Sequence, residues 1–404
     1  MSDTALPVIF HYGTNTQRLA FTPSPAAGVN QLYIWYETDT NNAYVYTTGW
    51  HQISSSSIGT VTNTGTLTSG KTIIGNGSAD VTVSSLTATI VKSTSGTLAA
   101  ATAGTDYVVP WSDICQGRLT TESGVPLSTA DRTAQGTIYF TPAIGANAIT
   151  NGQIALYNGS AVVVVPFTQL SLGLTVTSGK NYDVFVDYNS GTPQLVLSAA
   201  WTTDTARADA LGVQSGLIIK SGTAAYRWVG TIRASGSNVT ADSGGGSTTQ
   251  VGGQRFVWNA YQQLPRWLRV IDTTNTWSYT VNTTRVADNA TAPSNCVEYV
   301  VGAAATMLSA SLVASVKLAN SNNNDARAGI GIDSSTTYSG LVGEAYNALS
   351  SGVHMTISSS YDGTPGLGYH YVAWLETGGD GTCIFVGDDG STGVQSGLRA
   401  VLLG

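Results

Sequence analysis

The chain has 404 residues, of which only 10% are charged, and a formal net charge of −7. The chain is poor in charged helix formers and rich in Gly, Ser, Thr, Asn and Val. This composition favours strands and turns. The net charge is negative and the sequence has no cluster of basic residues. This argues against a nucleic-acid partner, because such an interface needs clustered Lys and Arg. The chain is longer than one ordinary hydrophobic core accommodates, which indicates several domains. With the strand-favouring composition, we expect an all-β, multi-domain protein.

No segment has the pattern of a membrane span or a secretion signal. The longest nearly unbroken apolar stretch, AVVVVPF (161–167), is far shorter than the ~20 residues that cross a bilayer. The first residues lack a basic region followed by an apolar one. Three distant cysteines, Cys115, Cys296 and Cys383, indicate buried thiols in a chain folded in a reducing cytoplasm. We predict no membrane insertion.

Residues 1–53 predict a small, aromatic-rich β module. QLYIWYETDTNNAYVYTTGWHQI has a strand at 31–37, a polar turn and a strand at 43–48, with Trp50 closing the face. So short a hairpin needs a partner surface to become stable.

The chain changes character over residues 54–111. From His51 to Asp106 it has no Phe, Trp or Tyr and only four charges. One copy cannot bury enough apolar surface to offset the ordering of its backbone, at ~1–2 kcal/mol per residue. The segment is therefore either a disordered linker or a slender shaft in which several chains form one core. Its short alternating strands favour the intertwined shaft, and with it a symmetric oligomer.

The octamer GTLTSGKT (65–72) matches the phosphate-binding pattern G-x-x-x-x-G-K-[ST]. That loop works between a buried strand and a helix whose N-terminal N–H groups hold the phosphates. Here TIIGNGSADV (72–81) follows, and its glycines and β-branched residues oppose a helix. We interpret the octamer as a turn between short strands of the shaft, with Lys71 in solvent.

Two β-sandwich, jelly-roll-like domains are expected, at 112–254 and 255–404. In the first, IALYNGSAVVVV (154–165) predicts a hairpin with a type I′ Asn-Gly turn. Strands recur there at the spacing of a sandwich or barrel. The Gly- and Ser-rich run at 240–254 is interpreted as the boundary loop.

The segment MLSASLVASVKL (307–318) in the second domain is ambiguous, since its apolar residues fit period two and, in part, a helix. We predict a strand, because serines and Lys317 fill most of the other face. RFVWNAYQQLPRWLRV (255–270) bridges the two domains. Three of its aromatic residues are expected to pack in the domain interface: Trp258, Tyr261 and Trp267.

Catalytic patterns are missing from the sequence. There is no H-E-x-x-H or G-x-S-x-G, and the four histidines lie far apart, without metal-ligand spacing. Glycoside hydrolysis needs two carboxylates that flank the sugar bond, but three of the C-terminal candidates stand in Asp-Gly dipeptides typical of hairpin turns. We predict no catalytic residue, metal site or cofactor. The carboxylates considered are Asp362, Glu376, Asp380, Asp388 and Asp389.

Several segments of the sequence resemble bacteriophage tail-fibre proteins. Two segments are similar to sequences in the shafts of these proteins: GNGSADVTVSSL (75–86) and LAAATAGTDYVVP (98–110). The aromatic hairpin resembles modules near their N-termini. GRLTTESGVPLSTADRTAQGTIYFTPAIG (117–145) looks like a module of phage structural proteins. The resemblance covers most of residues 1–254. It implies a homotrimeric virion protein, with the N-terminal module on other virion proteins and the C-terminal knob outward.

We therefore expect a non-enzymatic virion fibre, assembled in the host cytoplasm, that binds a host-surface polysaccharide through its C-terminal domain. Sugar rings would stack on aromatic side chains, with hydrogen bonds from Asn and Asp in loops. Three alternatives stay open: a capsid decoration or head fibre, a glycan depolymerase that uses C-terminal carboxylates, and a bacterial trimeric surface adhesin, which the missing secretion signal opposes. For each tyrosine the alternative is a place in the core or the trimer interface. The residues expected to bind the receptor are Tyr338, Tyr361, Asp362 and Tyr369.

Overall fold

The computed structural model describes residues 8–24, 31–53, 91–94, 97–100, 114–245, 250–291, 294–319, 324–347, 354–379, 381–388, 390 and 393–404. Contacts divide the chain into two compact units, Met1–Tyr107 and Val108–Gly404. Nearly all of the described elements are β-strands, so the all-β prediction is confirmed. Nowhere in these ranges is a helix long and apolar enough to span a bilayer.

Most of the predicted shaft, including the octamer at 65–72, lies outside the described residues. Within 54–111 the structure describes the antiparallel pair of β5 (Val91–Thr94) and β6 (Thr97–Ala100). The intertwined shaft therefore stays a prediction.

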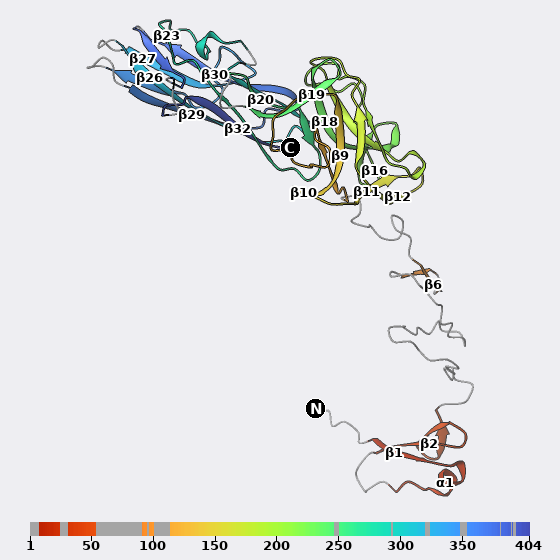
Figure 1. Cartoon of the computed structure of the whole chain (residues 1–404). Coiled ribbons are helices and arrows are strands. Elements are labelled where there is room, and N and C mark those ends of the chain that lie inside the picture. Colours follow the sequence, from red (N-terminus) through yellow and green to blue (C-terminus); the bar gives the residue numbers. More distant parts are fainter. Residues whose placement is uncertain are drawn as a thin grey trace. The chain divides into compact units, whose positions relative to one another are not determined.

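The smaller unit contains a four-stranded sheet and one short helix (Figure 1). The predicted hairpin is confirmed as the antiparallel pair of β2 and β3, while β1 adds parallel to β2. The elements are β1 (Val8–Gly13), α1 (Asn15–Ala20), β2 (Leu32–Glu37), β3 (Ala43–Tyr46) and β4 (Trp50–Gln52).

The helix α1 begins at a capping box that the sequence analysis missed. The Thr14 hydroxyl accepts a hydrogen bond from the Gln17 N–H, and the Gln17 side chain accepts one from the Thr14 N–H. The spacing Thr-x-x-Gln is the sequence signal of such a box. The helix then places Arg18 against Glu37, with 2.5 Å between Nε and Oε1.

The two faces of the small sheet differ sharply. One face holds an aromatic core, in which Trp35 packs edge-on against Trp50 at 5.9 Å and stacks on His11 at 5.6 Å. The other face leaves Phe10 and Tyr12 71% and 81% exposed, because alternate residues of β1 point away from the core. We call this the apolar face of the small unit; its exposed members are Val8, Phe10, Tyr12 and Tyr36.

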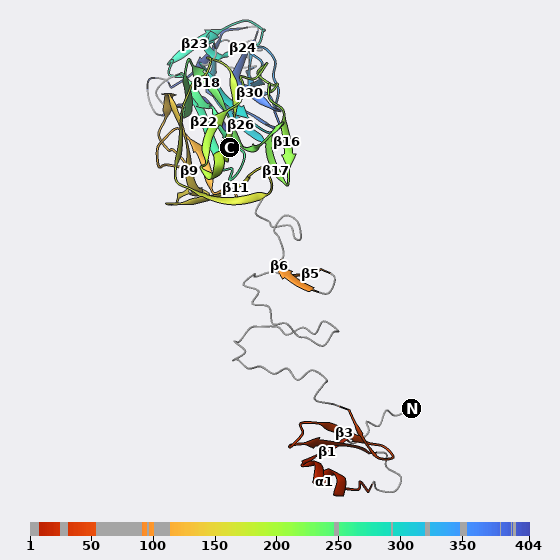
Figure 2. The same ribbon diagram turned by 90° about the vertical axis from the view of Figure 1, so that its right-hand side faces the viewer.

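The larger unit is built from stacked sheets (Figure 2). The largest sheet runs in the order β15 (Gln194–Leu197), β14 (Asn181–Asp187), β18 (Thr223–Gly236), β19 (Val239–Gly245), β20 (Gly252–Arg255), β25 (Cys296–Val301), β30 (Gly368–Gly378), β27 (Asn324–Ile332) and β28 (Gly343–Asn347). Beside this path lie β8 (Arg132–Gln135), β16 (Leu211–Gln214), β17 (Leu217–Lys220), β21 (Val257–Asn259) and β24 (Arg285–Val286).

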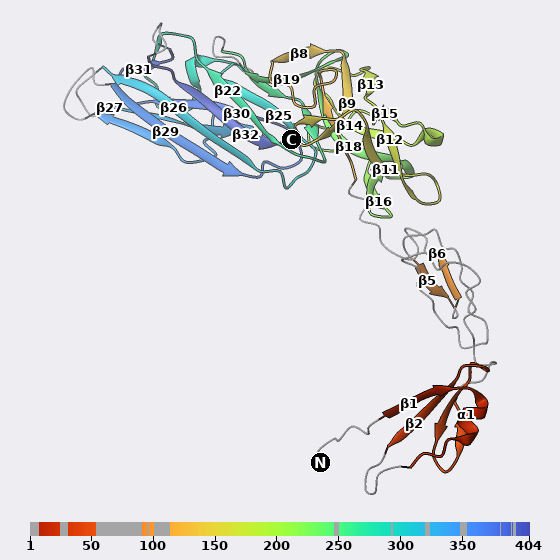
Figure 3. The ribbon, with the colours of Figure 1, turned by 60° about the horizontal axis from the view of Figure 1, so that its bottom comes forward.

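A second sheet covers part of the first, and its long strands run side by side in Figure 3. Its order is β22 (Pro265–Ile271), β32 (Gly397–Leu403), β26 (Leu308–Leu318), β31 (Cys383–Val386) and β23 (Thr276–Tyr279), with β29 (His354–Gly363) paired to β26. The remaining strands are β7 (Gly117–Thr120), β9 (Thr137–Ile144), β10 (Asn147–Ala148) and β13 (Leu170–Gly173) in one small sheet, and β11 (Gly152–Tyr157) with β12 (Val162–Phe167) in another. Short 3-10 turns occur at Asn189–Gly191 and Ala287–Asn289.

The two largest hydrophobic cores of this unit lie on either side of β14, which borders both of them. Val184 packs with Phe140 in the first core, whereas its neighbour Phe185 packs in the second, which also contains Leu312 and Trp374. All seven residues of β14 are buried, because each face of the strand meets a core. The largest sheet is thus shared by two sandwich-like halves.

The predicted boundary loop at 240–254 is wrong. The strands β19 and β20 occupy most of it, and β20 also runs parallel to β25. Glycine permits this close approach, since a Cβ on Gly252 would lie 1.6 Å from the carbonyl oxygen of Cys296. Residues 112–254 and 255–404 consequently share one sheet and lie in one compact unit.

The ambiguous segment 307–318 forms a strand, as predicted. It is β26, and its alternate residues from Leu308 to Leu318 are buried in the second core. The serines between them lie on the opposite side of the sheet, which is the pattern of a strand with one covered face.

The predicted hairpin at 154–165 is confirmed, but its turn is of another type. Tyr157 pairs with Val162, and the Asn158 N–H donates to the Ala161 carbonyl at 3.0 Å. Gly159 has a φ of +98° while the next residue has no positive φ. A positive φ at the first central residue alone is characteristic of type II′ rather than type I′.

Replacing Gly159 by alanine should destabilise the larger unit by about 1–2 kcal/mol, because an L side chain is strained in this left-handed conformation. Urea unfolding followed by tryptophan fluorescence measures the change. Gly173→Ala is the matched control, since Gly173 has no positive φ and a Cβ there would meet nothing within 4 Å. Equal losses in the two variants would contradict the assignment of strain to the turn.

Candidate binding face

Two of the predicted receptor-binding tyrosines are engaged in structural contacts. The Tyr338 hydroxyl lies 2.7 Å from Thr377 Oγ1. The Tyr369 hydroxyl donates to Glu298 Oε1 at 2.5 Å, and the Arg233 guanidinium lies 3.5 Å from the centre of its ring. Burial is the main cause that raises the pKa of both phenols. Both side chains are therefore held by neighbouring strands and loops.

Tyr361 and Asp362 are adjacent in sequence but point to opposite sides of β29. Tyr361 stands opposite Ala310 and packs against the second core. Asp362 stands opposite Ser309 and is exposed. Successive residues of a strand alternate between faces, so the two cannot act together on one side. Of the four predicted residues, Asp362 alone has an exposed side chain.

The three aromatic residues predicted in a domain interface have different surroundings. Trp258 is 1% exposed and stacks on Trp228 at 5.5 Å. Tyr261 packs against the first core, with the Arg227 guanidinium 4.5 Å from its ring centre. Trp267 is 63% exposed, so the prediction that it packs in an interface is wrong. The alternation of β22 turns its indole away from the core.

The three described carboxylates that were considered for glycan hydrolysis, Asp362, Glu376 and Asp388, are not gathered into one exposed site. Glu376 is fully buried and accepts hydrogen bonds from Trp277 Nε1 at 2.7 Å and Arg285 Nε at 2.8 Å. Asp388 accepts from the Gly390 N–H within its turn. Among the described residues, no group of three or more His, Cys, Asp or Glu side chains could hold a metal ion. Two further candidates, Asp380 and Asp389, lie outside the described residues.

The three cysteines are free and buried, as the sequence predicts. Burial raises the pKa of Cys115 to about 11 and that of Cys296 to about 12. The thiolate is the nucleophilic form of cysteine, so these two thiols are unreactive as nucleophiles in the folded protein.

An exposed face with defined chemistry lies on the side of β22, β32, β26 and β29 that is turned away from the core. We call it the outer face. Strand register arranges its side chains in rows that cross the four strands. The first row is Trp267, Val401, Ser309 and Asp362; the second is Arg269, Arg399, Ser311 and Ser360; the third is Ile271, Gly397, Val313 and Ser358.

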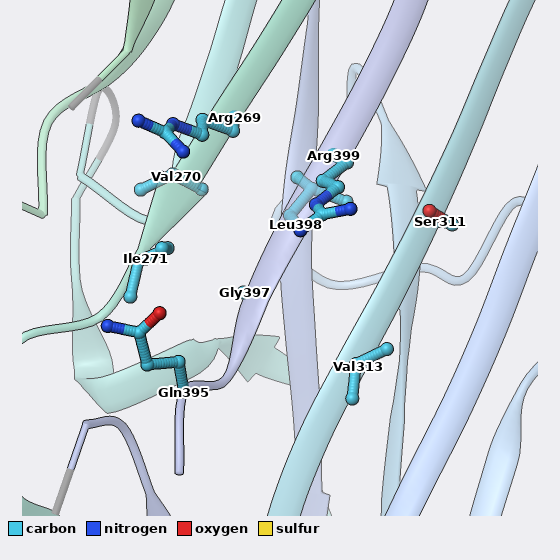
Figure 4. A pocket seen from close by; sticks show the side chains of 9 residues that line it. All are labelled: Arg269, Val270, Ile271, Ser311, Val313, Gln395, Gly397, Leu398 and Arg399. Carbon is cyan, nitrogen blue, oxygen red and sulfur yellow. The ribbon is translucent and has the colours of Figure 1, made fainter. Parts of the chain in front are cut away.

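A pocket of about 360 Å³ opens on the outer face between the second and third rows (Figure 4). Gly397 stands between Ile271 and Val313 in the third row and lines this pocket. Two guanidinium groups, from Arg269 and Arg399, lie along the pocket with Gln395 and Ser311. The sequence analysis missed both arginines, because they are separated by more than a hundred residues and only the strand register brings them together.

Comparisons with known proteins do not assign the chain to a family. No protein-family model and no curated protein matches it. A solved structure of infectious bursal disease virus, Gx strain, is 12% identical, covering 69% of this chain and 77% of that one, with a TM-score of 0.17. A Bacillus thuringiensis Cry1Da tryptic core variant is 7% identical, covering 68% and 50%, with a TM-score of 0.17. An exo-β-1,3-galactanase from Phanerochaete chrysosporium is 10% identical, covering 94% and 84%, with a TM-score of 0.11. At such TM-scores the likeness carries no argument about fold or function.

Proposed function

We propose that this chain is a non-enzymatic, homotrimeric structural fibre of a bacteriophage virion that binds a host-surface glycan through the outer face. The glycan-binding part of the proposal rests on Trp267, a largely exposed indole on a broad sheet face with Ser309 and Asp362 in the same row. Indole rings offer an apolar surface with a polar edge, and hydroxyl and carboxylate groups beside them suit the mixed chemistry of a sugar.

The apolar face of the small unit supports the attachment part of the proposal. A unit of this size buries little apolar surface by itself and gains stability from a partner. Phe10 and Tyr12 leave large rings in solvent on an edge strand. Exposed apolar patches of this kind mark protein interaction sites. We assign this face to the virion protein that holds the fibre.

The described carboxylates support a binding protein over a depolymerase. Glycoside hydrolysis requires two carboxyl groups placed on either side of an accessible bond. Glu376 is enclosed by Trp277 and Arg285, whereas Asp362 is exposed on a strand of the other sheet.

Adsorption of the purified protein to host cells tests the proposal, with Trp267→Ala as the informative variant. We expect the wild type to adsorb and Trp267→Ala to lose most of its binding. The matched control is Tyr346→Ala, an aromatic residue 53% exposed on β28 of the other sheet. Immunolabelling of virions locates the protein on a tail fibre or on the head. A wild-type protein that neither adsorbs to cells nor labels on virions would refute the proposal.

A further inference from the structure

The arginines of this chain follow a consistent pattern, from which two depart. Eight of the twelve form an ion pair with Asp or Glu: Arg18, Arg132, Arg207, Arg233, Arg255, Arg266, Arg285 and Arg327. Arg118 and Arg227 are buried and donate to backbone carbonyls. Arg269 and Arg399 are exposed, and neither has a carboxylate partner within the described part of the chain.

These two arginines are also direct cross-strand neighbours. Arg269 of β22 stands opposite Arg399 of β32 in the antiparallel register, and both lie on the outer face. Side chains in such positions start about 5 Å apart, and like charges there repel each other. Arg269 donates from Nε to the Gly245 carbonyl at 3.1 Å, which orients its guanidinium, and this neutral acceptor does not balance its charge. An anion bound between the two groups would turn this repulsion into attraction.

The surroundings of the pair fit a sugar that carries the anion. The pocket adds Gln395 and Ser311 as hydrogen-bonding groups and Val313 as an apolar wall. Trp267 lies two residues before Arg269 on the same face, about 7 Å along the strand. One sugar ring could therefore stack on the indole while the acidic group of the same or the next residue meets the guanidiniums.

We propose that Arg269 and Arg399 form a subsite for the acidic group of a glycan, a sugar carboxylate or sugar phosphate held by the paired guanidinium groups. The inference rests on the proposed function and narrows its ligand to anionic glycans. Guanidinium presents parallel N–H donors that match the oxygens of a carboxylate or a phosphate. Because both arginines are exposed, removing either charge leaves the core intact.

Binding of the full-length protein to immobilised polygalacturonate, with neutral pullulan as the reference, tests the subsite. We expect binding to polygalacturonate alone, weakening as salt rises because the charges are partly screened. Arg399→Gln and Arg269→Gln should each weaken binding about tenfold or more, since a charge-assisted hydrogen bond is lost. Competition by free glucuronate or by glucose 6-phosphate distinguishes a preference for carboxylate from one for phosphate.

Two controls separate failure of the subsite from failure of the proposed function. Arg327→Gln removes the same charge from an arginine whose side chain is 39% exposed and already pairs with Asp325 and Glu344, and it should bind as the wild type does. Host-cell adsorption is measured on the Arg269→Gln/Arg399→Gln double variant in parallel. If that variant adsorbs as the wild type does, or if polygalacturonate and pullulan bind equally, the acidic subsite is wrong while the fibre proposal stands. If the wild type adsorbs to no host cell, the receptor-binding function itself fails.

Discussion

Replacing Asp183 by asparagine should destabilise the larger unit by about 3–5 kcal/mol, because it leaves Arg207, whose side chain is only 14% exposed, without its counter-charge. Asp183 is fully buried on β14. Arg207 donates to both of its carboxylate oxygens, from Nε at 2.7 Å and from Nη2 at 3.1 Å. The indole N–H groups of Trp201 and Trp228 each donate to it at 3.0 Å, and Thr231 Oγ1 lies at 2.8 Å. Asparagine keeps the shape of the side chain but removes its charge and exchanges one acceptor for a donor.

The free energy of unfolding in urea measures this effect, and Trp201 and Trp228 serve as fluorescent reporters beside the substituted residue. Asp204→Asn is the matched control, because Asp204 pairs with Arg233 at 2.8 Å but has a side chain 52% exposed. An exposed pair contributes about 0–1 kcal/mol, so this control should lose little.

The pair can also be tested by a second substitution. We expect Arg207→Met to recover part of the loss in the Asp183→Asn background, because the largely buried cation without its counter-charge is then gone. If Asp183→Asn unfolds like the wild type, or if the two substitutions are additive, Asp183 does not hold the network together.

Asp183 also illustrates why burial was hard to predict from the sequence. In YDVFVDY (182–188) the alternation of Tyr and Val with Asp suggests one covered and one solvated face. The structure buries both faces, since β14 separates two cores. Hydrophobic alternation reports local periodicity, whereas the second core is formed by residues distant in the chain. The same periodicity was sufficient at 307–318, where one side of the strand is covered.

The binding face depends even more on long-range pairing. Tyr361 and Asp362 were both predicted to bind the receptor, yet they are neighbours on one strand and therefore face opposite ways. Trp267 was expected in an interface because it lies in the segment that bridges the two predicted domains, and only the register of β22 shows it beside Arg269 on the outer face. The pairing of Arg269 with Arg399 follows from which strands are neighbours, and a single sequence does not contain that information in readable form.

The glycine-rich segment at 240–254 was predicted wrongly for a different reason. The run at 240–254 has the composition of a loop, but its glycines lie where β19, β20 and β25 approach more closely than a side chain allows. Composition alone does not distinguish a glycine needed for a turn from one needed for close packing. By contrast, the capping box before α1 was a local signal, and the pattern at Thr14 and Gln17 would have identified that helix.

The stability of the larger unit should fall as pH rises from about 4.5 to about 7, and Glu376 should account for about 3 kcal/mol of the change. Burial raises the pKa of this carboxyl from 4.5 to about 7, although the Trp277 hydrogen bond and the Arg285 charge oppose the shift. Over this interval the folded protein binds the proton that the unfolded chain has released. Stability must therefore decrease with pH until Glu376 is ionised in the folded state as well.

Comparison with Glu376→Gln isolates this contribution from all other titrating groups. Glutamine still accepts a hydrogen bond from Trp277 and cannot ionise. The free energy of unfolding of the variant should therefore rise relative to that of the wild type through this pH interval. At higher pH the difference between the two should stay constant. Glu344→Gln is the control, since Glu344 is 48% exposed in its pair with Arg327 and such a pair contributes about 0–1 kcal/mol. Urea unfolding at a series of pH values gives both differences. A difference between wild type and Glu376→Gln that does not change with pH would mean that Arg285 fully offsets the burial of the charge, and that Glu376 is ionised in the folded protein throughout this interval.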